Sequence, residues 1–279
     1  MLKDMKTLLA QADGYALGAF EFWSVDSVRA ILNAAEACGR PVILQASTLE
    51  LNFMGWDAVA RVVPYLAERA AVPVALHLDH ADDIKWVCMA LDSGFTSVMI
   101  DASHHSFDDN VAVTREVIAL ARPRGVTVEA ELGRLPGAEG AIRVEEAEAY
   151  QTSVEEAVRF VALTNVDALA VAVGTVHGFY KTTPKINIER IAQLHAALDV
   201  PLVLHGGSGT PDDRIVEAIR AGIRKINVCT EFMDAYGASY SAARAGGDYR
   251  PTVKGLFEPA MQAGQEVIRR KIELFAPIE

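Results

Sequence analysis

Short, continuously apolar runs alternate with longer amphipathic stretches along the chain. Runs of this kind, rich in strand-forming residues, are typical of parallel strands that are buried on both faces. We therefore expect eight strands in one sheet. They cover Tyr15–Phe20, Pro41–Ser47, Val72–Asp79, Ser97–Ala102, Val126–Leu132, Ala168–Val173, Pro201–Gly207 and Lys225–Thr230.

Amphipathic segments that fit helices lie between these runs. They cover Asp26–Cys38, Trp56–Arg69, Asp83–Leu91, Asp109–Arg122, Ser153–Val161, Ile188–Ala197 and Asp212–Ala221, with Glu231–Ala243 and Glu258–Leu274 after the last run. Eight strand–helix units favour an α/β fold of the (β/α)8 TIM-barrel type over an open doubly wound sheet. No GxGxxG opens a helix after the first strand, which argues against a Rossmann fold. We predict one TIM-barrel domain over residues 1–279, with a helical extension at about 245–279.

The composition narrows the class of protein. Apolar residues make up 51% of the chain, enough for a large core, and no apolar run approaches the roughly 18 residues that span a bilayer. The start of the chain lacks the features of a secretory signal. Three cysteines without CxxC spacing indicate a cytoplasmic protein without disulfides. A net charge of −11 disfavours nucleic acid or an anionic membrane as partners, so an anionic substrate would need a local binding site.

Polar and titratable side chains gather where the expected strands end. In TIM barrels the active site is built at the carboxyl ends of the strands. A barrel built only for stability would not need such residues at one rim. From the second strand to the eighth, they are Ser47, Asp79, His80, Asp101, Glu129, Glu131, His177, His205, Asn227 and Thr230.

Three of the seven histidines, His80, His177 and His205, follow three different strands. A lone histidine near a strand is more often a hydrogen-bonded core residue than a ligand. Three at one barrel mouth instead match a catalytic zinc site, which has three protein ligands and an open position. His77 lies on the face of Asp79 but one layer deeper, where a supporting or structural role is expected. His195 lies in a helix and has no expected role.

The carboxylates could supply acid–base chemistry beside such a metal. Asp79 directly precedes His80 and is the candidate acid–base group. Asp101 and Glu131 could orient the ligands or form a second metal position. Glu129 shares a strand face with Glu131, because side chains two residues apart do so. The alternative is a network of ion pairs around the rim.

Glycine-rich turns follow the seventh and eighth strands, where TIM barrels bind phosphate groups. The first runs from His205 through Gly206, Gly207 and Ser208, and the second ends at Thr230. A long acidic segment, Gly133–Tyr150, follows the fifth strand and has the character of an active-site lid. A merely solvated loop is the alternative for that segment.

Six ordered motifs make the chain similar to a known family. They are Val74–His80, Ser97–His104, Val128–Gly133, Ala168–Gly178, Pro201–Gly209 and Lys225–Glu231. Over essentially its whole length the chain resembles class II fructose-bisphosphate and tagatose-bisphosphate aldolases. These are lyases that split a ketose 1-phosphate or 1,6-bisphosphate reversibly into dihydroxyacetone phosphate and an aldehyde through a zinc-stabilised enediolate.

The resemblance implies a role for each matching residue. His80, His177 and His205 would bind zinc, with Asp101 and Glu131 near it. Asp79 would handle the proton of the C4 hydroxyl, and Glu139 the proton at C3. The implied ligands of the phosphate and hydroxyl groups of dihydroxyacetone phosphate are Gly178, Lys181, Gly206, Gly207, Ser208, Asn227 and Thr230. The family also implies a monovalent cation such as Na⁺ or K⁺ near these loops, and a homodimer or homotetramer.

The chain departs from the family at the acceptor end of the substrate. Glu21 replaces a neutral amide, and Met233 replaces a basic residue, while Ser47 is retained. Gaining an acid and losing a base both disfavour a second phosphate, so we expect an aldehyde without one. Arg250 or Lys254, or a basic residue of a neighbouring subunit, could compensate.

Two other classes of function remain open at this point. A non-catalytic barrel subunit would not need the three histidines, Asp79 and Glu139 together. A zinc-dependent isomerase or epimerase could use the same enediolate, but it would not need Asp79 placed at C4.

Overall fold

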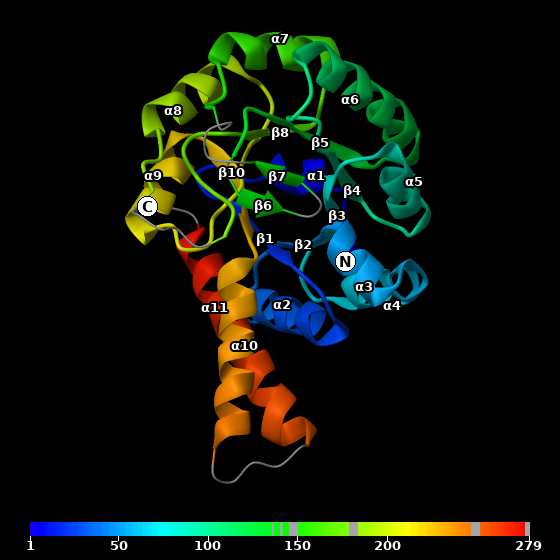
Figure 1. Cartoon of the computed structure of the whole chain (residues 1–279), viewed down its shortest axis with the longest axis vertical. Coiled ribbons are helices and arrows are strands. Elements are labelled where there is room, and N and C mark those ends of the chain that lie inside the picture. The colour runs from blue at the N-terminus through cyan, green and yellow to red at the C-terminus, as the bar shows by residue number, and fades with distance from the viewer. Residues whose placement is uncertain (136, 140–141, 145–149, 179–183, 247–251, 277–279) are drawn as a thin grey trace.

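Eight parallel strands close into a barrel in the computed structural model (Figure 1). The structure describes residues 1–135, 137–139, 142–144, 150–178, 184–246 and 252–276, without the side chains of 137–139 and 142–144. The barrel strands are β1 (Leu17–Glu21), β2 (Val42–Ala46), β3 (Val74–Ala81), β4 (Ser97–Ile100), β5 (Thr127–Leu132), β8 (Ala168–Val171), β9 (Leu202–Leu204) and β10 (Ile223–Val228). β1 pairs with both β2 and β10, which closes the ring and confirms the predicted (β/α)8 fold.

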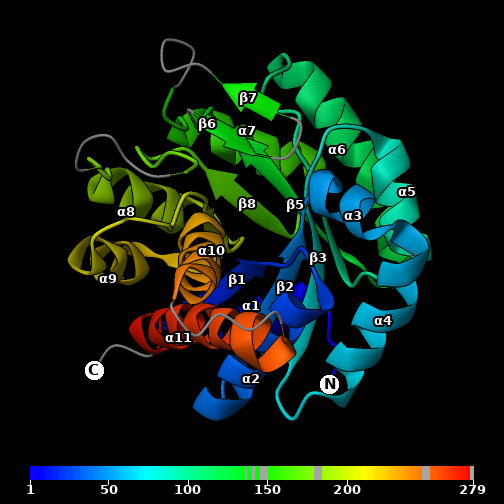
Figure 2. The same ribbon diagram turned by 60° about the horizontal axis from the view of Figure 1, so that its bottom comes forward.

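Helices cover the outside of the barrel (Figure 2). They are α2 (Val25–Cys38), α3 (Thr48–Met54), α4 (Trp56–Arg69), α5 (Ile84–Asp92), α6 (Phe107–Ala121), α7 (Val154–Thr164), α8 (Ile188–Ala197), α9 (Asp212–Ala221), α10 (Thr230–Ala245) and α11 (Glu258–Leu274). Their apolar faces pack on the strands and form the main core. Most begin at a side chain that caps the helix, as Ser24 does for α2 by accepting a hydrogen bond from the Ser27 N–H. No helix among the described residues is long and apolar enough to cross a membrane.

One end of the barrel is closed by the short helix α1 (Met5–Leu9). Met5 and Leu8 pack against small residues inside the barrel such as Ala19 and Ala75. The N–H group of Lys3 donates to the carbonyl of Val74, the first residue of β3, so α1 lies at the amino ends of the strands. The carboxyl ends are therefore left as the open mouth.

Two further features extend beyond the barrel wall. An antiparallel hairpin of β6 (Gly137–Glu139) and β7 (Ile142–Val144) follows β5, within the segment expected to form a lid. α10 and the first part of α11 project from the barrel as a two-helix arm (Figure 1), and α11 also packs against α2. A π-helical turn, η3 (Val253–Phe257), leads into α11 at the outer end of this arm.

Candidate active site

The carboxyl-end mouth buries an unusual number of polar side chains. Asp79 and His80, near the end of β3, are 0% and 1% exposed, and Glu131 on β5 is 2% exposed. His205 directly follows β9 and is fully buried. Side chains this deep need partners, because an unpaired buried polar group is costly.

The three predicted histidines meet at this mouth. The ring centroids of His80 and His205 lie 4.6 Å apart, and those of His80 and His177 lie 5.1 Å apart. Each ring offers one potential ligand atom, and these atoms all lie within 4.8 Å of one another. The Nε2 atoms of His80 and His177 and the Nδ1 atom of His205 are buried, without a hydrogen-bond partner among the described residues. Three unpartnered nitrogens around one space fit a divalent metal of the zinc type.

Carboxylates bind the other nitrogens of two of these rings. The Nδ1 atom of His80 lies 2.8 Å from Oδ2 of Asp101, and the Nε2 atom of His205 lies 3.0 Å from Oε1 of Glu129. A carboxylate on one ring nitrogen fixes the tautomer and the ring orientation, and it leaves the other nitrogen free for a metal. Asp101 thus lies where a ligand-orienting residue was expected, but for His205 the orienting carboxylate is Glu129 rather than Glu131.

Glu131 stands closer to the unpartnered nitrogens. Its Oε2 atom lies 3.5 Å from Nδ1 of His205 and has no hydrogen-bond partner among the described residues. Glu131, His80 and Asp101 form a second group whose ligand atoms are mutually close. The geometry is therefore compatible with Glu131 as an additional ligand or as part of a second metal position.

A local irregularity of β3 brings two consecutive side chains to the site. Successive strand residues normally point to opposite faces, yet both Asp79 and His80 face the mouth. His80 has a φ of 43°, in the left-handed region, and the pairing of β3 with β4 shifts between Leu78 and Ala81. A break in register of this kind re-aims side chains, and such breaks are common beside active sites.

Asp79 is held by amide groups and is charged. Nε2 of Gln45 donates to its Oδ2 at 3.0 Å, and Nδ2 of Asn227 donates to the same oxygen at 3.2 Å. Burial opposes ionisation of Asp79, but the charge of His80 and the hydrogen bond from His77 outweigh it, so its pKa lies well below the usual range. Asp79 is therefore ionised at neutral pH.

The electrostatic environment of the three histidines and the nearby carboxylates favours binding of a cation. Burial and the nearby Asp101 carboxylate raise the pKa of Glu131 well above its ordinary value. Burial and the neighbouring rings of His80 and His205 hold the pKa of His177 well below its ordinary value, so this ring is neutral. A divalent cation would satisfy both the crowded carboxylates and the neutral imidazole.

A cavity beside the histidines gathers most of the predicted substrate ligands. It is lined by Gln45, His177, Gly178, Gly206, Ser208, Asn227, Cys229 and Thr230. A Cβ atom on Gly206, which has a φ of 72°, would lie 2.2 Å from the carbonyl oxygen of Val176. A Cβ atom on Gly207 would lie 2.7 Å from the carbonyl oxygen of Asn227. Only glycine permits this close approach of the loops.

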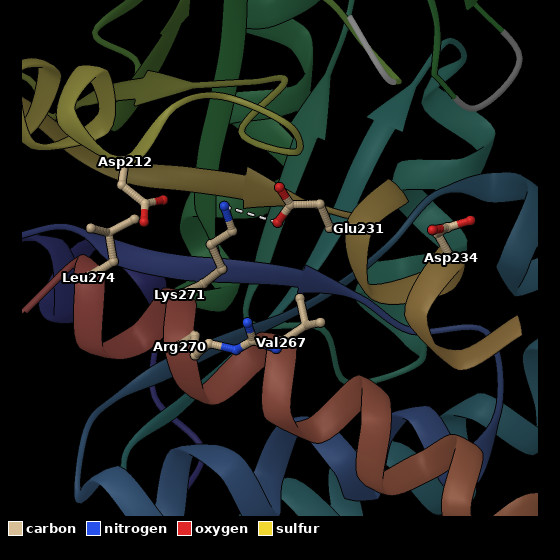
Figure 3. Close-up of a pocket in the computed structure, with 7 residues that line it drawn as sticks. All are labelled: Asp212, Glu231, Asp234, Val267, Arg270, Lys271 and Leu274. Carbon is tan, nitrogen blue, oxygen red and sulfur yellow. Dashed lines mark ion pairs between the residues drawn. The ribbon is translucent and has the colours of Figure 1, made fainter. Parts of the chain in front are cut away.

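Glu231 links the two loops on the phosphate side. Its Oε1 atom accepts a hydrogen bond from the Gly209 N–H at 2.6 Å, and its own N–H donates to Oγ of Ser208 at 3.3 Å. Its Oε2 atom pairs with Nζ of Lys271 on α11 at 2.9 Å. Figure 3 shows this ion pair at a surface cavity on the outer side of the loops. The loops are thereby fixed to the outer helix layer.

The predicted acceptor-end residues are only partly brought together. Glu21 is 1% exposed; its Oε1 atom accepts from the Ser47 N–H at 2.6 Å and its Oε2 atom from Nε2 of Gln45 at 3.1 Å. Because Gln45 also donates to Asp79, Glu21 is linked to Asp79 through one amide group. The side chain of Met233, on α10, is 40% exposed.

Some predicted residues cannot be positioned. Lys181 and Arg250 lie outside the described residues. The backbone of Glu139 belongs to β6, but its side chain is not described. Lys254 is exposed in η3, the turn that leads into α11. At the base of the hairpin segment, Nη2 of Arg134 donates to the carbonyl of His104 at 2.9 Å, which anchors it to the segment after β4.

Two buried polar residues at the site, Gln45 and Lys225, were not singled out from the sequence, and Glu129 was named only as a rim residue that shares a face with Glu131. Each lies two residues before a rim residue on its strand, and so does His77. Residues two apart share a strand face. A polar residue inside an apolar strand, two positions before a rim residue, is therefore the pattern that could have identified them.

Comparisons with known proteins identify the family and the fold. A family model for class-II fructose-bisphosphate aldolase matches residues 3–278. The solved structure of the YdjI aldolase from Escherichia coli K12 is similar at 32% identity and a TM-score of 0.89, covering 99% of this chain and 98% of that chain. A protein from Coccidioides immitis, provisionally named a fructose-1,6-biphosphate aldolase, is 30% identical with a TM-score of 0.87 over 97% of this chain and 95% of that one. Fructose-bisphosphate aldolase from Campylobacter jejuni shares the fold at 24% identity and a TM-score of 0.78, over 98% and 94% of the two chains.

Proposed function

The chain belongs to the class-II fructose-bisphosphate aldolase family, and we propose that it is a zinc-dependent lyase acting on a phosphorylated ketose. The products would be dihydroxyacetone phosphate and an aldehyde, formed reversibly. The observation that carries the proposal is the set of three unpartnered imidazole nitrogens, on His80, His177 and His205, beside the charged carboxylate of Asp79.

The donor set fits the proposed metal. Three imidazole ligands with room for substrate are the arrangement found in catalytic zinc sites. A zinc ion held by these rings would supply Lewis acidity, which polarises a carbonyl group and stabilises the negative charge that develops beside it. A Schiff-base lysine is then unnecessary, in agreement with the apolar composition of β8, Ala168–Val171.

Asp79 is the proposed acid–base group for the C4 hydroxyl. In cleavage it accepts the hydroxyl proton as the bond between C3 and C4 breaks, and in condensation it returns that proton. Its depressed pKa keeps the carboxylate ionised at neutral pH. Gln45 and Asn227 hold the carboxylate in place, so little reorganisation is needed during the reaction.

Glu139 is the proposed group that moves the proton at C3 of dihydroxyacetone phosphate. The assignment rests on its position in the sequence, eight residues after Glu131. The hairpin that carries its backbone directly follows β5, the strand of Glu129 and Glu131. A group on a segment outside the barrel wall could approach after the substrate binds, as lid residues do.

The glycine-rich loops are the proposed site for the phosphate of dihydroxyacetone phosphate. α10 begins at Thr230, so its N–H groups and its dipole favour an anion there. Gly178, Gly206, Gly207 and Ser208 would offer further backbone and hydroxyl groups, with Lys181 nearby in sequence. Asn227 would hold the substrate hydroxyl. A monovalent cation at these loops remains part of the proposal.

At the other end of the substrate we propose an aldehyde without a distal phosphate. Glu21 places a buried, hydrogen-bonded carboxylate two contacts from Asp79. Met233 carries no charge, and its side chain is partly exposed. A phosphate near Glu21 would be repelled, whereas neutral hydroxyl groups could donate to its oxygens.

Self-association is also proposed. Val253 and Phe257 near the outer end of the arm are 72% and 42% exposed. Apolar side chains on a projecting helical arm are more readily explained by burial against a second copy than by contact with water. A homodimer or homotetramer would supply that contact.

The decisive experiment condenses dihydroxyacetone phosphate with a panel of aldehydes and reads the product mass. We expect products with a new carbon–carbon bond, formed only when a divalent metal is present. Metal-independent condensation together with a borohydride-trapped covalent adduct would contradict the proposal. Interconversion of ketose phosphates without carbon–carbon cleavage would indicate an isomerase or epimerase instead.

A further inference from the structure

Beneath the histidine cluster, the barrel interior holds a fully buried ion pair that the proposed chemistry does not use. Nζ of Lys225 on β10 lies 2.9 Å from Oε2 and 3.2 Å from Oε1 of Glu129 on β5. Both side chains are completely excluded from solvent. The layers inside a TIM barrel are usually filled by branched apolar side chains. A salt bridge is an exception there, because two charges must be taken out of water.

The ion pair is connected to one of the proposed metal ligands. Oε1 of Glu129 lies 3.0 Å from Nε2 of His205, so one carboxylate serves both the ammonium of Lys225 and the imidazole. That contact leaves Nδ1 of His205 directed at the other two histidines. The orientation of His205 therefore depends on where Glu129 is held.

The ammonium of Lys225 also lies close to His77, which in turn lies close to the carboxylate of Asp79. Nζ of Lys225 lies 3.4 Å from Nε2 of His77, and the same Nε2 atom lies 3.6 Å from Oδ1 of Asp79. Nδ1 of His77 is 2.7 Å from Oγ of Ser97, which fixes the ring. His77, Asp79 and Glu129 bring ligand atoms as close together as a metal site would. The ammonium lies against two of these three residues.

We propose that Lys225 is a built-in cation that balances this cluster and, through Glu129, positions His205 for the catalytic metal. The inference rests on the proposed metal site but adds a residue that touches neither metal nor substrate. A positively charged side chain supplied by the fold is always present, whereas a second metal ion would have to be bound from solution. Lys225 is thus a positioning residue.

The inference predicts a loss of metal affinity when the charge is removed. Lys225→Met keeps the length of the side chain but leaves Glu129 as an unbalanced buried carboxylate. Partners that orient metal ligands typically change metal affinity by about 10- to 100-fold. We expect a loss of that size in Lys225→Met, measured by zinc competition against a chromophoric chelator without substrate.

A second genetic background, Glu129→Gln, distinguishes a positioning role of Lys225 from a packing role. In Glu129→Gln, the amide oxygen can still accept from His205 but no longer needs a balancing charge. Adding Lys225→Met to this variant is expected to change zinc affinity by less than about 3-fold, because coupled residues are not additive. An equal loss in both backgrounds would overturn the inference.

Lys6→Met is the control. Lys6 also forms an ion pair, at 2.8 Å from Asp167, but its side chain is exposed and it lies on α1, at the closed end of the barrel. We expect its zinc affinity to equal that of the wild type. A loss like that of Lys225→Met would show that removing any paired lysine has this effect, and it would overturn the inference.

The results also separate this inference from the proposed function. Zinc binding that is unchanged by His205→Ala would contradict the proposed metal site itself. Unchanged zinc affinity in Lys225→Met, with normal wild-type binding, would overturn only the role of Lys225. If Lys225→Met does not fold, Lys225→Gln is measured in the same two backgrounds, with the same outcomes deciding.

Discussion

The Nδ1 atom of His80 lies 2.8 Å from Oδ2 of Asp101, and this contact decides which nitrogen of the ring faces the other histidines. Asp101 is itself held, because its Oδ1 atom accepts a hydrogen bond from the Ser103 N–H at 3.1 Å. A short chain of contacts thus runs from the backbone after β4 to a proposed metal ligand. Asp101 need not contact the metal in order to tune it.

Asp101→Ala is expected to weaken zinc binding by about 10- to 100-fold, because His80 loses the group that orients it. The measurement is a competition titration of the folded protein. Asp108→Ala is a suitable control, since Asp108 is largely exposed and pairs with Arg159 on the surface. Equal affinities in the two variants would show that the contact between His80 and Asp101 is not needed for metal binding.

Removal of the metal should abolish carbon–carbon cleavage, and added zinc or cobalt should restore it. His205→Ala is expected to lose bound metal while keeping the fold, because its ring lies at the barrel mouth rather than in the main core. Metal content by mass spectrometry and circular dichroism check the two parts. A chelated protein that retains full activity would refute the metal mechanism.

The two proposed acid–base groups should act in two different partial reactions. Asp79→Ala is expected to lower cleavage by about 10²- to 10⁴-fold while leaving proton exchange at C3 of dihydroxyacetone phosphate largely intact. Glu139→Ala is expected to slow that exchange. Deuterium uptake by mass spectrometry follows the exchange. If Asp79→Ala impairs cleavage and exchange equally, its assignment to C4 is wrong.

The acceptor end should discriminate against a distal phosphate. Two unit charges 4 Å apart repel by roughly 4 kcal/mol at an effective dielectric of 20, so a phosphate beside Glu21 is strongly disfavoured. We expect weak cleavage of fructose 1,6-bisphosphate relative to ketose 1-phosphates, and a gain for the bisphosphate in Glu21→Asn with Met233→Arg. The measurement is kcat/KM for both substrates. Wild-type bisphosphate cleavage at about 10⁴ M⁻¹s⁻¹ or above would refute this selectivity.

Acid should destabilise the protein through Glu129. Burial opposes the charged form, but Lys225 and the hydrogen bond to His205 outweigh it and lower the pKa of Glu129 from 4.5 to about 2. A pKa depressed in the folded state contributes stability above pH 4.5, and that stability is lost as the pH falls towards 2. We expect Tm to fall across this window. The fall should be shallower in Glu129→Gln, and identical slopes would contradict the assignment.

The barrel was predictable because its strands are continuously apolar and alternate with amphipathic helices. The predicted strand Val72–Asp79 and the observed β3 (Val74–Ala81) differ by two residues at each end, as expected for strand limits judged by composition alone. α3 (Thr48–Met54) was missed. It is short, and it begins at the Ser47 cap, a residue that the sequence assigns to the rim and to the acceptor end of the substrate.

The candidate site was only partly predictable for a physical reason. His80, His177 and His205 could be grouped because strand ends converge in a barrel whatever the details of register. The contact of Glu129 with His205 could not be predicted, because it depends on which side chains meet across the barrel interior. Lys225 was hidden for the same reason, since a lysine in an apolar strand reveals no partner until the opposite wall is known.

The left-handed backbone of His80 sets stability against activity within one residue. A non-glycine residue in this region costs on the order of 1 kcal/mol, which glycine would not incur. Glycine at this position would therefore relax the strand while deleting a proposed metal ligand. The strand thus bears its backbone strain at a residue whose ring the proposed metal site needs and whose loss would leave the buried Asp101 carboxylate without its imidazole partner.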